Sequence, residues 1–342
     1  MKRYAHLVGS AGLKDAETVF TTVSQILGSC CRRIPDGETG ARSYWIRWQR
    51  ETFASHTDLE AAITTRSLPG YKDSVERTFF RLRDGASSDR LEFKELGYAD
   101  EALKSYNIFA RLLKDGRIPA DTRFQVALPT SMALLCGFVV AEDRLKVESA
   151  IERAIIRDLD RIQTTIPASH LSIQWDVCHE VVGAEGGLPL PYENAIDGSV
   201  ERIVRLCSKV IDGVELGIHL CYGDPGHKHV LEPKDLQVSI SFANGICRNS
   251  PRQIDFVHMP VPRDRTDDAY FAPLKNRRLS AKTRLILGLV HYTDGIEGSR
   301  KRMAAAERYV TDFDVATECG FGRRDPATIP ELLRIHRELC DQ

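Results

Sequence analysis

The sequence has no long hydrophobic run and no excess of charge of one sign. Its longest apolar stretch, 132–141, is about half of the ~20 residues that a helix needs to cross a bilayer, and its first residues contain no apolar signal core. The 47 Lys and Arg residues balance 48 Asp and Glu residues, and no long basic run occurs. We therefore expect a cytoplasmic protein that binds neither membranes nor nucleic acid.

A disulfide framework and flexible linkers are also absent. The nine cysteines are an odd number, scattered through a chain that is too large to need disulfides. We expect free thiols that pack in the core or bind a metal. No long Pro, Gly or Ser linker, low-complexity tract or internal repeat divides the 342 residues, which predicts one domain over 1–342.

Short β-branched or apolar runs alternate with longer segments of helical spacing. Segments such as 141–165 and 198–211 repeat apolar positions every three or four residues, as amphipathic helices do. A weaker strand ends near Ile34, and the other expected strands are 4–8, 124–128, 171–175, 213–219, 254–258, 284–290 and 312–316. This alternation of about eight strands with helices predicts an α/β fold, a (β/α)8 (TIM) barrel.

One stretch, 75–96, does not fit the alternation of strands and helices. It contains two short runs of strand character on either side of Asp84-Gly85, which is a hairpin turn signal. We expect a small hairpin inserted into the barrel at this point.

The main chemical signal is His219-Leu220-Cys221 in the expected fifth strand. Alternate residues of a strand point to the same face, so this histidine and cysteine can reach one metal ion. Cys319 follows the last expected strand, whose end faces the fifth across the mouth of a closed barrel. Two thiolates and one imidazole suit zinc. A buried histidine beside a packed cysteine explains the pair alone equally well.

These motifs also carry a family resemblance. The HxCY pattern at His219 and the CGxxxR pattern formed by Cys319, Gly320 and Arg324 resemble the cobalamin-independent methionine synthase family, within the larger group that includes uroporphyrinogen decarboxylase. Further segments that resemble family motifs follow in the expected order along nearly the whole chain. They are Val8-Gly9-Ser10, Gly37-Glu38, Leu128-Pro129-Thr130 and Ile173-Gln174-Trp175-Asp176.

The resemblance implies a function and a set of roles. It implies zinc bound by His219, Cys221 and Cys319. It also places Ser10, Glu38 and Asp176 where the family holds the amino and carboxylate groups of homocysteine. A thiol that binds zinc loses its proton and becomes a nucleophile at neutral pH. We therefore expect a zinc-dependent transferase that activates a thiol, or a thiol-like substrate, for methyl or alkyl transfer. Surface or helix-capping carboxylates are the alternative for the two acids.

Several positions depart from the family pattern. Pro260 stands where the family has a glutamate ligand of zinc, and the nearby His258 either completes the metal shell, borders it or packs in the core. Gly137 replaces a tryptophan of the folate site, and Val177 replaces an acidic residue. His291 lies about two positions from the histidine that assists methyl transfer. These departures, with the lack of the family's extra N-terminal barrel, argue against methyltetrahydrofolate as donor, although Trp175 or Phe138 can rebuild an aromatic surface.

Other candidates lie in loops that follow expected strands. Asp224, His227 and His229 are placed for proton transfer or substrate contact, and Arg263 for a substrate carboxylate or phosphate. Polar surface loops explain both groups equally well.

Two other functions stay open at this point. One is a zinc-dependent lyase or hydrolase that acts on a small polar carbonyl substrate. The other is a non-catalytic zinc protein with a closed metal shell. In the leading hypothesis the partner is a small molecule, a thiol or an amino acid. The donor, the fourth ligand and the oligomeric state are left undetermined.

Overall fold

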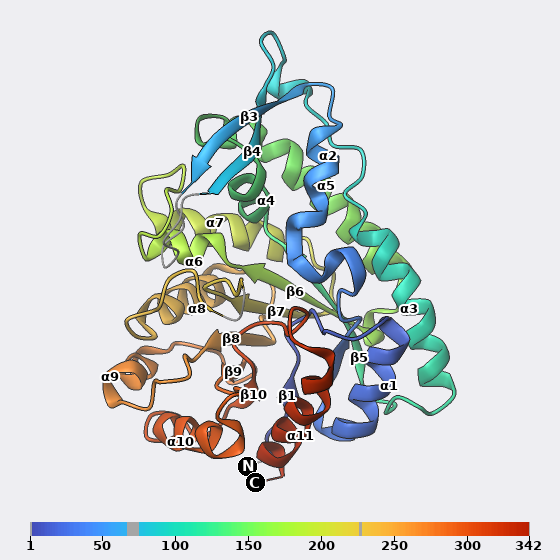
Figure 1. Ribbon diagram of the computed structural model, residues 1–342, viewed down its shortest axis with the longest axis vertical. Coiled ribbons are helices and arrows are strands. Elements are labelled where there is room, and N and C mark those ends of the chain that lie inside the picture. Colours follow the sequence, from blue (N-terminus) through green and yellow to red (C-terminus); the bar gives the residue numbers. More distant parts are fainter. Residues whose placement is uncertain (1, 67–74, 226–227, 342) are drawn as a thin grey trace.

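The computed structural model describes residues 2–66, 75–225 and 228–341, and its centre is a parallel sheet of eight strands (Figure 1). The strands are β1 (Ala5–His6), β2 (Arg33–Pro35), β5 (Arg123–Pro129), β6 (Leu171–Val177), β7 (Glu215–Leu220), β8 (Phe256–Pro260), β9 (Arg284–Gly288) and β10 (Asp314–Ala316). They follow the order β1-β10-β9-β8-β7-β6-β5-β2. A parallel bridge from Ala5 to Cys31, just before β2, joins the two ends of the sheet. The predicted (β/α)8 barrel is confirmed.

Helices surround the barrel (Figure 1). The longer ones are α1 (Ala16–Leu27), α3 (Tyr98–Lys114), α4 (Ser131–Phe138), α5 (Arg144–Thr165), α7 (Ala195–Cys207), α8 (Gln237–Asn249), α10 (Gly295–Glu307) and α11 (Ile329–Cys340). The shorter ones are α2 (Arg50–Ala54), α6 (His179–Ala184) and α9 (Asp268–Phe271). The expected helices 141–165 and 198–211 correspond to α5 and α7. Within the described residues, none of the helices has the length and apolar character of a membrane span.

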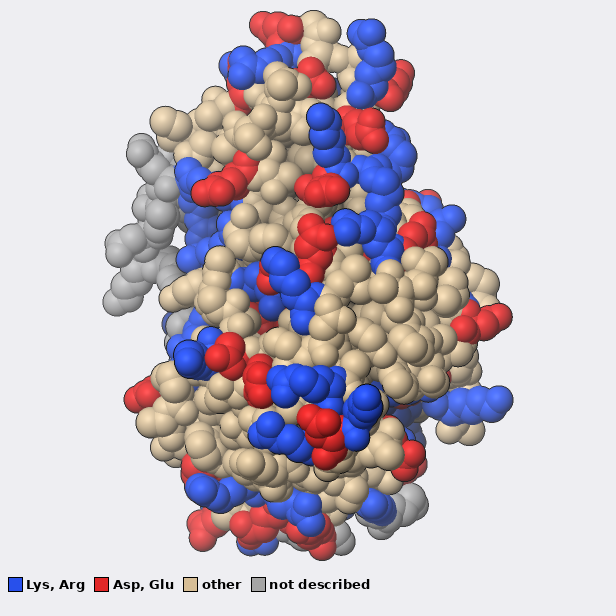
Figure 2. Space-filling model, turned by 90° about the vertical axis from the view of Figure 1, so that its right-hand side faces the viewer, with Lys and Arg blue, Asp and Glu red and all other residues tan. Residues whose placement is uncertain are grey.

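Side-chain caps and amphipathic faces explain where the helices begin and how they pack. The Asp15 carboxylate accepts a hydrogen bond of 2.9 Å from the Thr18 backbone amide and so caps α1. The buried face of α1 includes Val19, Phe20 and Val23. Because α1 packs against α11 and β1 pairs with β10, the two chain termini lie close together (Figure 1). On the face in Figure 2, acidic and basic side chains are intermingled, as the balanced composition predicts.

An inserted hairpin is present, but the predicted one, over 75–96, was wrong. The structure pairs β3 (Leu59–Arg66) with β4 (Val75–Leu82) in antiparallel register. Residues 67–74 between them lie outside the described part of the chain. After β4 the chain turns at Asp84-Gly85 and forms a short 3-10 helix, Ser88–Arg90, instead of a second strand. Val75–Leu82 therefore pairs with the strand that precedes it in the sequence. In Figure 1 the hairpin lies at the end of the molecule farthest from the termini.

Polar side chains inside the barrel satisfy the backbone that follows the very short β1. The Gln125 side-chain amide donates to the carbonyls of Leu7 at 2.8 Å and Val8 at 3.0 Å, and the Gln174 amide donates to Val8 at 2.7 Å. Buried carbonyl groups need such donors when no strand neighbour supplies them. These bonds hold the segment that leads from β1 to Ser10.

Candidate metal centre and cavity

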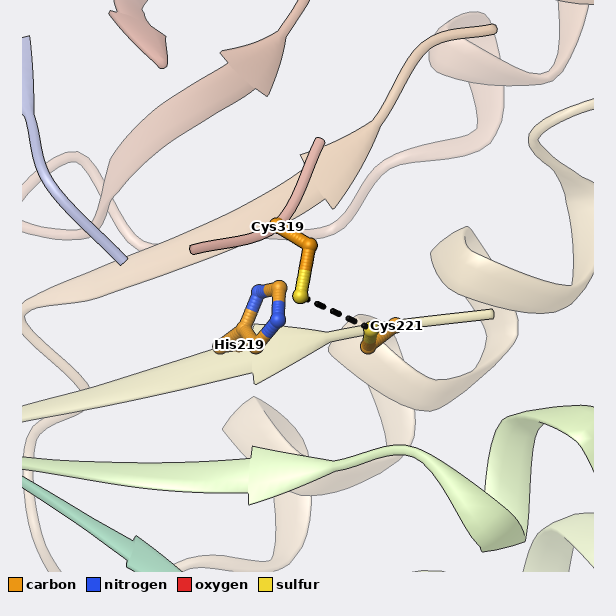
Figure 3. Close-up of side chains that lie close together, drawn as sticks. All are labelled: His219, Cys221 and Cys319. Carbon is orange, nitrogen blue, oxygen red and sulfur yellow. Dashed lines mark hydrogen bonds between the residues drawn. The ribbon is translucent and has the colours of Figure 1, made fainter. Parts of the chain in front are cut away.

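His219, Cys221 and Cys319 come together at the carboxyl ends of the strands. His219 belongs to β7, Cys221 follows that strand directly, and Cys319 follows β10. One ligand atom from each residue lies within 4.8 Å of the others, and the two sulfur atoms are 3.8 Å apart (Figure 3). The three side chains point toward one another in Figure 3. This geometry leaves room for one ion between an imidazole and two thiols, which is a donor set that zinc prefers.

Hydrogen bonds set the tautomer of His219. The Thr317 carbonyl can only accept, so Nε2 of His258, 3.0 Å away, carries a proton. Burial lowers the pKa of His258 to about 3, so its ring is neutral and its Nδ1 has no proton. That Nδ1 lies 2.7 Å from Nδ1 of His219, which must donate. Burial also places the pKa of His219 well below its ordinary value. Its Nε2 therefore carries a free lone pair.

The Nε2 atom of His219 is the clearest sign that the cluster fits a metal. This atom is buried and has no hydrogen-bond partner among the described residues. A buried polar atom without a partner is costly, and native proteins rarely leave one. Histidines that bind metals usually have their other ring nitrogen fixed by a hydrogen bond. The Nδ1 of His219 is fixed in this way by His258.

His258 lies beside the cluster. Both of its ring nitrogens form hydrogen bonds, one to His219 and one to Thr317. Among the described residues, the candidate metal group holds the three predicted ligands only. Pro260 lies in β8, and its carbonyl accepts a hydrogen bond of 2.8 Å from the Tyr270 hydroxyl.

A cavity of about 820 Å³ opens over the cluster. It is lined by all three candidate ligands and by four of the other predicted site residues, namely Ser10, Glu38, Asp176 and Asp224. His258, His291, Arg263 and the loop residue His229 do not line it. The His291 ring bonds the Val261 carbonyl at 2.9 Å, and Arg263 is exposed with its guanidinium 3.4 Å from the Thr293 hydroxyl.

Glu38 and Asp176 form an acidic pair in the cavity. Burial raises the pKa of Glu38 to about 8, with a further rise from the neighbouring Asp176. Burial likewise raises the pKa of Asp176 to about 7, although the Gln174 amide donates to its carboxylate at 2.9 Å. Since burial disfavours the charged forms, a bound cation would stabilise the ionised pair. The two carboxyl groups suit a substrate ammonium.

Backbone strain is concentrated at the same cavity. Glu38 and Trp45 have positive φ angles of 45° and 55°, and they are the non-glycine residues of the described chain that do so. Both line the cavity. Such conformations cost about 1–3 kcal/mol each and cluster at functional sites. Trp45 is held in place by the ring of His179, which stacks on it at 5.5 Å.

The loop residues predicted for proton transfer are engaged in ion pairs. Asp224 pairs with Arg323 at 3.1 Å, and the same guanidinium lies 3.9 Å from the Cys319 sulfur. His229 lies 3.1 Å from both Glu232 and Glu318. Burial opposes a charge on this ring, but the two glutamates raise its pKa to about 10. His227 lies outside the described residues.

Sequence reasoning missed several cavity residues. Cys178 also lines the cavity, two residues beyond Asp176, and so repeats the spacing of His219 and Cys221 on the neighbouring strand. That repeated spacing was a usable signal. The aromatic wall includes Trp45 and the expected Phe138, whereas Trp175 is fully buried outside the cavity. Three further missed residues, Arg47, Arg50 and Arg77, line it as well.

Gly137, where the resembling family has tryptophan, packs against the end of the Ile46 side chain. A Cβ atom at this position would lie 2.7 Å from Cδ1 of Ile46, so a larger side chain would require Ile46 to move.

Comparison with known proteins yields matches to solved structures only. No family model matches the chain, and no curated protein matches its sequence. The chain is similar to a B12-independent methionine synthase from Shewanella sp. W3-18-1 in complex with selenomethionine, with 13% identity and a TM-score of 0.57, over 95% of this chain and 86% of that one. A putative vitamin-B12 independent methionine synthase from Listeria monocytogenes has 12% identity and a TM-score of 0.57, again over 95% of this chain and 86% of that one. A methyltransferase from Methanosarcina mazei has 11% identity and a TM-score of 0.57, over 100% of this chain and 95% of that one. These identities show a shared fold.

The acidic pair predicts a pH dependence of stability. The folded-state pKa values of Glu38 and Asp176 lie above the ordinary ones, so the protonated pair favours folding at low pH. That contribution is lost as the pH rises from the ordinary carboxyl pKa, about 4, up to the raised values of about 7 and 8. Glu38→Gln should therefore exceed the wild type in unfolding free energy at pH 8.5 by about 1 kcal/mol or more, and the difference should disappear near pH 4.

Urea unfolding of the metal-free and ligand-free protein measures this difference. Glu142→Gln, which removes an exposed carboxylate, is the matched control and should leave the pH profile unchanged. Equal stability of Glu38→Gln and wild type at pH 8.5 would mean that folding does not disfavour the ionised form of Glu38.

Proposed function

We propose that the protein is a zinc-dependent transferase that binds a thiol substrate at the metal and activates it for methyl or alkyl transfer. The observation that carries this proposal is the unpartnered Nε2 of His219, buried beside the thiols of Cys221 and Cys319 at the base of a cavity. These three residues would hold the ion. When bound, zinc lowers the pKa of a coordinated thiol, so that a thiolate is available at neutral pH.

The protein's own residues would orient the substrate. Glu38 and Asp176 would bind its ammonium group, and the positive charge would in turn bring both carboxyl groups to their ionised form. His258 would keep the proton of His219 on Nδ1, so that Nε2 faces the ion. Arg323 would lie beside Cys319 and its negative charge, with Asp224 balancing the guanidinium.

The structural neighbours support the same class of reaction. Two of them are described as B12-independent methionine synthases, one in complex with selenomethionine, and a third as a methyltransferase. A selenoether amino acid is the kind of product that methyl transfer to a selenol or thiol amino acid leaves in a site. The acidic pair of this chain would suit the ammonium of such a molecule.

The first prediction of this proposal concerns metal content. Purified protein reconstituted with zinc should hold about one ion per chain, and Cys221→Ser or Cys319→Ser should lower this content because each removes one of the proposed ligands. Elemental analysis after dialysis measures it. Cys247→Ser, a half-buried cysteine on α8, is the control and should keep its zinc. A wild-type protein that retains no transition metal would refute the proposal.

A second prediction separates a ligand from a residue that positions one. His258→Ala should weaken zinc affinity about 10–100-fold, because His219 loses the hydrogen bond that sets its tautomer, while the number of nitrogen ligands stays unchanged. Competition with a chelator gives the affinity, and X-ray absorption gives the ligand count. A lost nitrogen ligand in His258→Ala would make His258 a ligand, and unchanged affinity would leave it a packing residue.

The third prediction tests thiol activation without assuming a natural donor. The zinc-loaded protein should methylate homocysteine with methyl iodide at pH 7 about tenfold or more faster than the metal-free protein does. A tenfold gain corresponds to a barrier lowered by about 1.4 kcal/mol. Mass spectrometry of methionine measures it. Cys319→Ser should abolish the gain, and Asp176→Ala should raise the homocysteine requirement while zinc stays bound.

Two outcomes would change this account. We expect no methionine from methyltetrahydrofolate, because Gly137 leaves the folate position of the family empty; catalytic turnover with that donor would overturn this expectation. Zinc that binds without accelerating any thiol methylation would contradict the transferase and favour the zinc-dependent lyase or hydrolase.

A further inference from the structure

Three arginines of the cavity have no place in the thiol chemistry. Arg47 belongs to the 3-10 segment Gly40–Gln49, and Arg50 begins the helix α2 that follows directly. Arg77 comes from β4 of the inserted hairpin. All three line the same cavity as the metal cluster. Two separate segments of the chain thus bring three arginines to one cavity.

These guanidinium groups carry unbalanced charge. Among the described residues, no carboxylate forms an ion pair with Arg47, Arg50 or Arg77. Burial lowers the pKa of Arg77, and the positive charge of Arg47 lowers it further, so these two groups repel each other. Like charges held close together without a counterion cost stability.

Several arginines of low exposure in this chain form ion pairs with carboxylates. Arg33 binds Glu215 at 2.6 Å, Arg42 binds Asp36 at 2.7 Å, and Arg302 binds Asp294 at 2.6 Å. Within the cavity itself, Arg323 is balanced by Asp224. Arg77 is half-buried, has no such partner among the described residues and lines the cavity together with the exposed Arg47 and Arg50, so the three side chains are open to an anion from outside the chain.

The neighbouring surface is aromatic. Trp45 stacks on His179, and the guanidinium of Arg47 lies 5.3 Å from the ring centre of Tyr44, which is 53% exposed. Flat rings beside guanidinium groups suit a molecule with a planar or apolar body and a charged end.

We infer that Arg47, Arg50 and Arg77 form an anion subsite, which binds an oxyanionic group of the second substrate, the one that reacts with the metal-bound thiol. Guanidinium groups present paired N–H donors that match phosphate, sulfonate and carboxylate oxygens. The acidic pair and the arginines would then sort the two substrates by charge, with the ammonium at Glu38 and Asp176 and the anion at the arginines. The identity of the anion as a second substrate rests on the proposed function, whereas the anion site itself does not.

Anion binding to the metal-free protein tests this inference. Calorimetric titration at low ionic strength with pyrophosphate, inorganic phosphate, methanesulfonate and acetate compares the wild type with Arg77→Gln and with the double variant Arg47→Gln/Arg50→Gln. We expect each variant to weaken the tightest-binding anion about tenfold or more, as the loss of a charge-assisted hydrogen bond predicts. The anion that binds most tightly identifies the oxyanion class. Arg300→Gln, which removes an exposed arginine of α10 paired with Glu338, should leave the affinity unchanged.

Thermal unfolding without added anion supplies a second readout. Arg77→Gln should raise the melting temperature, because it removes the repulsion between Arg77 and Arg47. If Arg77 stabilised the fold, the same substitution would lower the melting temperature. Equal anion affinity in the wild type and both cavity variants would overturn the inference, and so would a lower melting temperature with unchanged affinity. Because no metal is present, this failure is distinct from a failure of the thiol chemistry.

Discussion

The chain of hydrogen bonds from the Thr317 carbonyl through His258 to His219 is the constraint on which the site depends. A backbone carbonyl of the β10 loop decides where the proton of His258 lies, and this choice passes to His219 across two neighbouring strands. This series of hydrogen bonds ends at an unpartnered Nε2 near two thiols, so the barrel presents a lone pair that would suit a metal ion. The same loop bears Cys319, so one segment supplies both a thiol and the acceptor that orients the imidazole.

The parallel barrel brings the rest of the chemistry to that point. Carboxyl ends of parallel strands meet at one mouth, which gathers Asp176 from β6, His219 from β7 and Cys319 after β10 around a single cavity. Burial then gives each group a distinct character. The carboxyl pair is held partly neutral, and the imidazoles of His219 and His258 are neutral. In the proposed function an ammonium, a thiol and an anion would each find a complementary group.

Much of the barrel and of the metal cluster was predictable from the sequence, because both follow from regular spacing. Alternating strand and helix patterns predicted the eight strands, and the two-residue period of a strand placed His219 and Cys221 on one face. The hairpin was misplaced because Asp84-Gly85 is a strong local turn signal, while the real partner of β4 lies earlier in the chain. Arg47, Arg50, Arg77 and Trp45 were missed since they come from irregular or inserted segments, including a residue with positive φ. No period in the sequence predicts which cavity such segments face.

The measurement that tests the central claim most directly is zinc X-ray absorption on the reconstituted protein, recorded with and without homocysteine. The account predicts one nitrogen and two sulfur ligands from the protein, and one additional sulfur when the thiol is present. A shell with more than one histidine, or a sulfur count that does not change on addition of homocysteine, would contradict it.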